Sequence, residues 1–345
     1  MTAEEGLMIV GRDEAARRRI VAVLLAYESL PENRFTRVRD EVTGPIVDAL
    51  HQSVETVRKE LSNGLVFEFP YRSKIARDFV MSVPERPDHV WEPQTTRLLL
   101  HLSRTVTDVI IGGAYFGDQA IPIADALRGR GTCHAFEPDS AQSASLERNA
   151  GLNGLDNVRV NSVGLWSDST SRLGFVGQDA LATTVARESA DGVPTTTIDD
   201  YAEAEEIERV GLIMLDLEGV EMTVLRGAER VLRDHAPHIV FEVHGAFVDW
   251  SRGLHEVEIV RFLQSLGYTI FAIRDFQSNM DLGGRPIELV PPETAWLEGP
   301  PHGFNLVAVR DPALLEGEVF RVVPGVSPKL LLHRDPRLHH PVGGL

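Results

Sequence analysis

Cysteine is almost absent from this 345-residue chain, in which Cys133 is the only one. A single cysteine excludes an intrachain disulfide framework and a cysteine-rich zinc site. Basic residues are also scarce, with 34 Lys and Arg against 51 Asp and Glu, which gives a formal net charge of -17. Because binding through nucleic-acid phosphates needs clustered Lys and Arg, we expect no nucleic-acid partner.

Long apolar runs are missing as well. No stretch reaches the length needed to span a bilayer, and the N-terminal sequence MTAEEGLMIVGRDEAARRR has no apolar core followed by a small-residue cleavage site. We therefore expect a cytoplasmic protein with no membrane partner. Hydrophobic residues still make up 43% of the chain, which allows a sizeable core. The length fits one large α/β domain with extensions, or two modest domains.

The N-terminal third has the apolar spacing of helices. The segments EAARRRIVAVLLAYESL and PIVDALHQSVETVRKEL predict helix from about residue 14 to residue 61. Asn63-Gly64 then ends the helix and opens a short strand, LVFEFPY. We expect residues 1–100 to form a mainly helical cap, whose apolar helices are suited to a homo-oligomer interface.

From Asp108 onward, apolar strands alternate with amphipathic helices. The seven expected strands predict an α/β fold over residues 101–312, with a doubly wound, mostly parallel, Rossmann-like sheet and an antiparallel edge. The stretch after NVRVNSVGL is hydroxyl-rich and is expected to be irregular. The region 313–345 is expected to be a loose extension.

The first strand of this domain ends in a glycine-containing turn, GGAYFG, where open α/β sheets bind ligands. Its spacing differs from GxGxxG, the signature of a dinucleotide pyrophosphate site. The second strand ends at Glu137, whose carboxylate could accept hydrogen bonds from both ribose hydroxyls. Turn and acid together favour an adenosine-containing cofactor, and S-adenosyl-L-methionine over NAD. Glycines that only serve a tight turn, and a solvated acid at a strand end, are the competing interpretations.

Several segments resemble the FkbM-type S-adenosylmethionine-dependent methyltransferases over about residues 90 to 310. The most specific of them are DLEGVEMTVLRGA and FEVH. The resemblance implies methyl transfer to hydroxyl groups of natural products, often sugars or macrolides. In the family's first motif, V-I-D-x-G-A-N-x-G, Ile111 stands at the Asp position and Tyr115 at the Asn position. That Asp normally helps to hold the methionine end of the cofactor, so its loss bears on cofactor affinity. The expected cofactor-binding residues are Gly113, Ala114, Tyr115, Gly117, Glu137, Pro138, Val163 and Asp216.

The ends of the fourth and fifth strands, LDLEG and FEVHG, bring carboxylates and an imidazole to the rim where the methyl group would be transferred. We expect Asp216, Glu242 and His244 to be catalytic, with His244 as the base because its ordinary pKa of about 6.5 suits neutral pH. The same three residues could instead hold Mg²⁺, which would lower the pKa of the acceptor hydroxyl. The competing interpretation is structural: Glu218 or Glu221 caps the next helix and His244 makes only a structural hydrogen bond.

Three functions follow from this pattern. The favoured one is an O-methyltransferase acting on a small hydroxylated metabolite. The substitution at Ile111 motivates a second, a non-catalytic binding protein that retains the methyltransferase fold. A nucleotide-dependent oxidoreductase is third, and the spacing of the glycine turn disfavours it.

Overall fold

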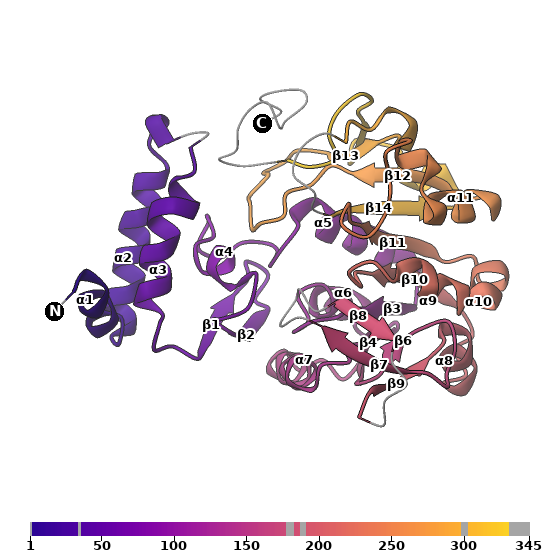
Figure 1. The fold of residues 1–345 in the computed structure, drawn as a ribbon, viewed down its shortest axis with the longest axis horizontal. Helices are drawn as coiled ribbons and strands as arrows, with labels where there is room; N and C mark the ends of the chain where they lie inside the picture. Colours follow the sequence, from indigo (N-terminus) through magenta and orange to yellow (C-terminus); the bar gives the residue numbers. More distant parts are fainter. Residues whose placement is uncertain (1, 34–35, 177–182, 187–190, 298–302, 331–345) are drawn as a thin grey trace.

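The computed structural model describes residues 2–33, 36–176, 183–186, 191–297 and 303–330 (Figure 1). The N-terminal region stands apart from a large sheet, with a small hairpin between them (Figure 1). None of the described helices is long and apolar enough to cross a bilayer.

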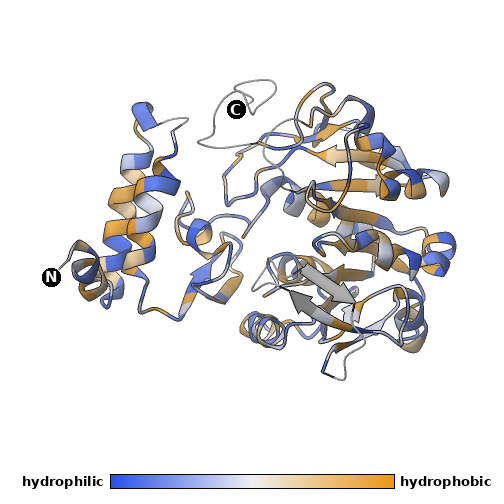
Figure 2. Ribbon diagram, viewed as in Figure 1, coloured by the Kyte–Doolittle hydropathy of each residue, from blue (hydrophilic) through white to orange (hydrophobic). Residues whose placement is uncertain are grey.

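The N-terminal cap contains α1 (Ala3–Val10), α2 (Glu14–Glu28), α3 (Gly44–Leu50) and α4 (Ala76–Val80). The prediction of helix up to residue 61 is wrong, because α3 ends at Leu50 and Thr56–Glu60 forms strand β1. β1 pairs antiparallel with β2 (Val66–Pro70), and Gly64 adopts a φ of 90° in the connection. An Asn-Gly pair between two short strands is a strong hairpin signal, and it overrides the helical spacing here. Figure 2 shows hydrophobic and hydrophilic residues mixed around α2 and α3.

The main sheet has nine strands in the order β15-β13-β12-β14-β11-β10-β3-β4-β5. Their bounds are β3 Asp108–Gly112, β4 Thr132–Phe136, β5 Val158–Asn161, β10 Val210–Leu215, β11 His238–Val243, β12 Thr269–Ile273, β13 Ile287–Val290, β14 Phe304–Val309 and β15 Phe320–Val322. The seven predicted strands are all present, and the α/β, mostly parallel fold is confirmed. The antiparallel strand β14 lies inside the sheet, between β11 and β12, while β13 and β15 extend the edge.

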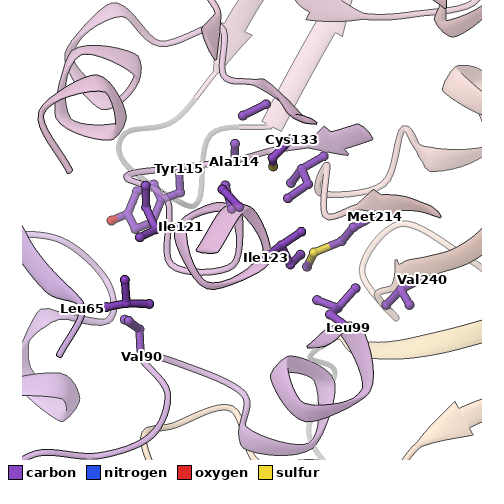
Figure 3. Packing of buried hydrophobic residues seen from close by; sticks show 14 of the residues in the cluster. Leu65, Val90, Leu99, Ala114, Tyr115, Ile121, Ile123, Cys133, Met214 and Val240 are labelled. Atoms are coloured by element: carbon purple, nitrogen blue, oxygen red, sulfur yellow. The ribbon is translucent and has the colours of Figure 1, made fainter. Parts of the chain in front are cut away.

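Helices cover both faces of this sheet. They are α5 Pro93–Leu102, α6 Ala120–Leu127, α7 Ser140–Leu152, α8 Ile198–Ala204, α9 Glu221–Arg226, α10 Glu229–Asp234 and α11 Glu258–Ser265. Alternating strand residues supply two cores: Val109 and Ile111 pack on the face covered by α5, α6 and α7, and Ile110 packs on the face covered by α8 to α11. Figure 3 shows the first core, in which Leu65 of the cap lies near Tyr115 and Ile121.

The hydroxyl-rich stretch is more regular than expected. It contributes to a second sheet of order β6-β9-β7-β8, formed by β6 Gly164–Leu165, β7 Arg172–Val176, β8 Thr183–Ala186 and β9 Val193–Thr196. Its hydroxyl side chains gave no alternating apolar pattern to reveal the strands.

The beginning of the C-terminal extension is packed, which corrects the prediction of a loose tail for its described part. β15 joins the sheet, and Ser327, Lys329 and Leu330 are buried. Backbone hydrogen bonds fix this segment to Asp275, whose N–H donates to Pro328 O at 2.9 Å and whose carbonyl accepts from Leu330 N at 2.8 Å. The region 331–345 lies outside the described residues.

Candidate active site

The glycine turn follows β3 and packs against the end of β10. Gly113 and Ala114 both donate their N–H groups to Phe136 O, each at 3.0 Å. Gly113 has a φ of 77°, and a Cβ atom there would lie 1.9 Å from the carbonyl oxygen of Asp216. Gly117, with a φ of 97°, closes the turn through its N–H to Ala114 O. Glycine at position 113 is therefore required by backbone contact as well as by conformation.

Glu137 lies against this turn, and its carboxylate accepts hydrogen bonds from backbone groups. One oxygen accepts from Tyr115 N and the other from Asp139 N, both at 2.9 Å. Burial raises the pKa of Glu137 to about 7, although these two bonds oppose the rise. Each oxygen retains a second lone pair, so the carboxylate can hold the turn and still accept from a hydroxyl.

A cavity of about 230 Å³ lies next to the glycine turn, between the cap and the start of α7. It is lined by Pro70, Ser73, Tyr115, Phe116, Asp139, Ala141, Gln142 and Ser145. The Oγ atom of Ser73 is buried without a hydrogen-bond partner among the described residues. Pro138 follows Glu137 on the same loop, whereas Val163 packs against the core under α8 to α11. The cavity is smaller than most drug-sized ligand pockets, so it would hold part of a nucleoside-sized ligand.

The two departures from the first motif have different structural consequences. Ile111 is 1% exposed and belongs to the apolar core, with Ala135 and Met214 as its neighbours in the sheet. Tyr115 is left-handed, with a φ of 50°, and its ring lies 4.7 Å from that of Phe116. A bulky residue in this conformation costs of order 1–3 kcal/mol, and the backbone bond to Glu137 helps to hold it.

Beyond the turn, carboxylates gather along the carboxyl ends of β10 and β11. Asp216 follows β10, and a side-chain hydrogen bond joins it to Glu242 near the end of β11. Burial raises the pKa of both groups, and the charge of Asp216 raises that of Glu242 further. Asp118, just past the glycine turn, has a pKa of about 7, because it is desolvated and also senses Asp216. Burial and the neighbouring carboxylates therefore favour the protonated form of Glu242.

Glu92, which sequence reasoning missed, completes this group from the start of α5. It has a φ of 47° and is 5% exposed, and its Oε2 atom accepts from Asn305 Nδ2 at 2.7 Å. Burial and the charge of Asp216 raise its pKa well above the ordinary value. An available signal was Asn305 itself, a polar residue inside the apolar strand FNLVAV.

Glu221 and Glu218 have separate roles on the loop after β10. Glu221 accepts from Leu217 N at 2.8 Å and Gly219 N at 3.3 Å, so it holds the preceding loop and does not cap α9 as the structural interpretation expected. Glu218 lies 3.8 Å from Lys74 of the cap. Lys74 lowers the pKa of Asp216, so the cap brings a cation to the rim.

His244 lies at the rim, but its ring is committed to a backbone bond. Its Nδ1 atom is 2.9 Å from Ala246 N, which can only donate a hydrogen. The neutral ring must therefore carry its proton on Nε2 and present that atom as a donor. Burial, Lys74 and Lys329 lower the pKa of His244, which favours this neutral form. In this conformation the geometry argues against His244 as the base.

The donor set does not fit a metal ion. Among the described residues, no group of three or more His, Cys, Asp and Glu side chains is arranged to hold one. Asp216 and Glu242 share a hydrogen bond instead, and His244 has Nδ1 occupied.

Comparison with known proteins identifies the domain. Residues 112–270 match the family model described as the methyltransferase FkbM domain, which is somewhat less than half of the chain. No curated protein matches.

Solved structures show only distant similarity. Methyltransferase FkbM from Methylobacillus flagellatus KT is 14% identical, with a TM-score of 0.36, over 59% of this chain and 43% of that one. A putative O-methyltransferase from Klebsiella pneumoniae is 15% identical, with a TM-score of 0.33, over 63% and 79%. A tRNA (uracil-54, C5)-methyltransferase from Pyrococcus abyssi, in complex with S-adenosyl-L-homocysteine, is 14% identical, with a TM-score of 0.35, over 74% and 44%. These values are too low to carry an argument about function. The family match assigns residues 112–270 to the methyltransferase FkbM domain.

Proposed function

We propose that this chain transfers a methyl group from S-adenosylmethionine to a hydroxyl of a small natural product, such as a sugar or a glycosylated metabolite. The observation that carries this proposal is the position of Asp216 and Glu242 near the carboxyl ends of the paired strands β10 and β11, where the Asp216 backbone meets the glycine turn. Methyl transfer to a hydroxyl needs a positioned nucleophile and a group that accepts its proton.

The residues around the turn fit the cofactor. Glu137 would accept hydrogen bonds from the ribose, since each of its oxygens has a lone pair to spare. Asp118 and Asp216 would face the cationic methionine end, which compensates for the apolar residue at position 111. When bound, the cofactor supplies an electrophilic methyl group.

The rim residues divide the remaining work. The carboxylate of Asp216 accepts the hydroxyl proton, and the hydrogen bond from Glu242 holds that carboxylate in place. A raised pKa makes this carboxylate a stronger base than an ordinary exposed Asp. His244 donates from Nε2 and orients the acceptor.

The first test is calorimetric titration of S-adenosyl-L-homocysteine, with and without Mg²⁺. We expect micromolar binding that is unchanged by Mg²⁺. Methyl transfer from labelled S-adenosylmethionine to a panel of hydroxylated glycosides then tests the reaction. Absence of binding would favour the non-catalytic alternative, which Ile111 motivates. Binding without transfer to any hydroxyl in the panel would contradict the O-methyl assignment.

A further inference from the structure

Two buried oxygen acceptors near the rim have no hydrogen-bond donor in the part of the chain that the structure describes. Glu242 on β11 and Asn305 on β14 are paired directly opposite each other in the sheet, and they are 7% and 2% exposed. Glu242 Oε2 and Asn305 Oδ1 lack a hydrogen-bond partner among the described residues. An unsatisfied buried polar group costs about 1–3 kcal/mol, so the fold retains two unfavourable atoms at one place.

The surroundings of these atoms are strongly acidic. Asn305 donates to Glu92, and Glu242 is bonded to Asp216, so both acceptors lie within one carboxyl cluster. The charge that opposes this cluster is Lys74, which lowers the pKa of both Glu92 and Asp216. Lys74 lies 3.8 Å from Glu218 on the neighbouring loop. The cluster therefore favours a ligand that brings positive charge.

The number of acceptors narrows the ligand further. An ammonium group carries one positive charge and three N–H donors on a single atom, which suits two neighbouring acceptors without donors and the carboxyl group of Glu92 beside them. A water molecule supplies two donors but no charge, and an anion would be repelled. A divalent metal does not fit, because the described side chains include no suitable group of ligands.

We propose that Glu92, Glu242 and Asn305 form a binding site for an alkylammonium group, which the methyl acceptor carries. In the strand order β14-β11-β10-β3, this site lies beyond Asp216 from the glycine turn, on the side away from the cofactor loop. The inference rests on the proposed function and narrows its substrate to a hydroxylated amine, such as an amino sugar. The cofactor's own α-ammonium has the same chemistry, and the experiment separates the two sources.

The experiment is calorimetry on the full chain with two sets of probes. The first set is S-adenosyl-L-homocysteine and its deaminated analogue. The second is a panel of methyl glycosides of amino sugars and their N-acetyl derivatives, titrated with and without saturating S-adenosyl-L-homocysteine. Titration in buffers of different ionisation enthalpy reports proton release, which is expected when a cation displaces protons from the carboxyl cluster.

The test variant is Glu242→Gln, with Asn305→Ala as the second. Asp249→Asn is the matched control, because it removes the same charge from an exposed position on the loop after β11. Circular dichroism and thermal unfolding verify that each variant is folded.

If the acceptor supplies the ammonium group, amino glycosides bind at least 10-fold tighter than their N-acetyl forms, with proton release. Glu242→Gln and Asn305→Ala then remove this preference and leave the affinity for S-adenosyl-L-homocysteine unchanged. If the cofactor supplies the ammonium group, Glu242→Gln lowers the affinity for S-adenosyl-L-homocysteine at least 10-fold and leaves the affinity for the deaminated analogue unchanged. That result keeps the ammonium site and overturns its assignment to the acceptor.

The proposal is overturned if neither probe set distinguishes amine from neutral compound in the wild-type protein. Failure of the proposed function looks different, because S-adenosyl-L-homocysteine itself then does not bind. In that case the titrations of the glycosides without S-adenosyl-L-homocysteine test the site. A preference for the amines that Glu242→Gln abolishes supports the ammonium site, and the absence of any preference rejects it.

Discussion

On the β3–β4 side of the rim, the buried carboxylate of Glu137 has a backbone N–H on each oxygen. On the β11–β14 side, Glu242 and Asn305 are buried just as deeply, yet each retains an oxygen with no partner among the described residues. On the first side, the buried carboxylate of Glu137 therefore fixes the backbone of the glycine turn. The second side keeps acceptor atoms that a bound ligand could satisfy. The two sides of the rim therefore differ in whether the protein itself or a ligand supplies the hydrogen-bond donors.

The largest expected effect comes from breaking the first side at Gly113. In Gly113→Ala, the new Cβ would collide with the Asp216 carbonyl, so the turn must move. We expect the affinity for S-adenosyl-L-homocysteine to fall at least about 100-fold, or about 2.7 kcal/mol, and the unfolding temperature to fall as well. Gly129→Ala is the control, since Gly129 has a similar φ of 71° with nothing within 4 Å. Wild-type affinity in Gly113→Ala, measured by calorimetry, would show that the turn does not hold the cofactor.

Asp216 lies where the two sides meet, and it gives the next largest effect. We expect Asp216→Asn to lower the single-turnover rate of methyl transfer about 100-fold or more, because it removes the proton acceptor. His244→Gln should cost less than about tenfold, since the ring acts as a donor and Gln also donates. The opposite order of these two rates would return the role of base to His244.

Buried carboxyl groups on both sides of the rim make the stability of the fold depend on pH. Burial raises the pKa of Asp118, Glu137 and Glu221 to about 7 and raises that of Glu242 as well. Their protonated forms favour folding, so this stabilisation is full below about pH 4 and is lost as the pH rises towards 7.

We therefore expect the unfolding temperature of the ligand-free protein to fall by about 3 °C or more between pH 5 and pH 7.5. The fall should be smaller in Glu242→Gln, which has one buried carboxyl fewer, and unchanged in Asp249→Asn. Thermal scans across this range test the idea, and a rising unfolding temperature would refute it.

The smallest effect is expected outside both sides. The Tyr71 hydroxyl donates to Asp48 Oδ1 at 2.7 Å, and its ring stacks on His51 within the cap. Tyr71→Phe should lower the free energy of unfolding by about 1 kcal/mol. Affinity for S-adenosyl-L-homocysteine should stay within about twofold, and a larger change in titration would extend the binding region into the cap.

The sequence was most informative where one strand or turn determines the outcome. Continuous apolar runs in GLIMLDLEG and HIVFEV identify buried strands directly, and they place Asp216 and Glu242 at the same edge. The helix expected up to residue 61 failed because helical spacing was given more weight than the Asn-Gly turn. β13 and β15 are short strands whose pairing depends on segments distant in sequence.

The residues on the β14 side of the site could not be predicted from local sequence patterns. Glu92 and Asn305 meet across a separation of 213 residues, and neither belongs to a spaced motif. The tautomer of His244 depends on the backbone of Ala246, which a list of residue types does not reveal. Such contacts depend on the tertiary packing of segments and not on the local sequence.

The N-terminus of α5 has a consequence for the order in which this protein folds. Asp275 caps that helix by accepting from Gln94 N at 3.0 Å and Thr95 N at 2.7 Å, across 181 and 180 residues. Such distant partners meet only after long stretches of chain have been ordered, and this slows folding. The segment that positions Glu92 is therefore completed only after Asp275, about 180 residues further along the chain, has reached it.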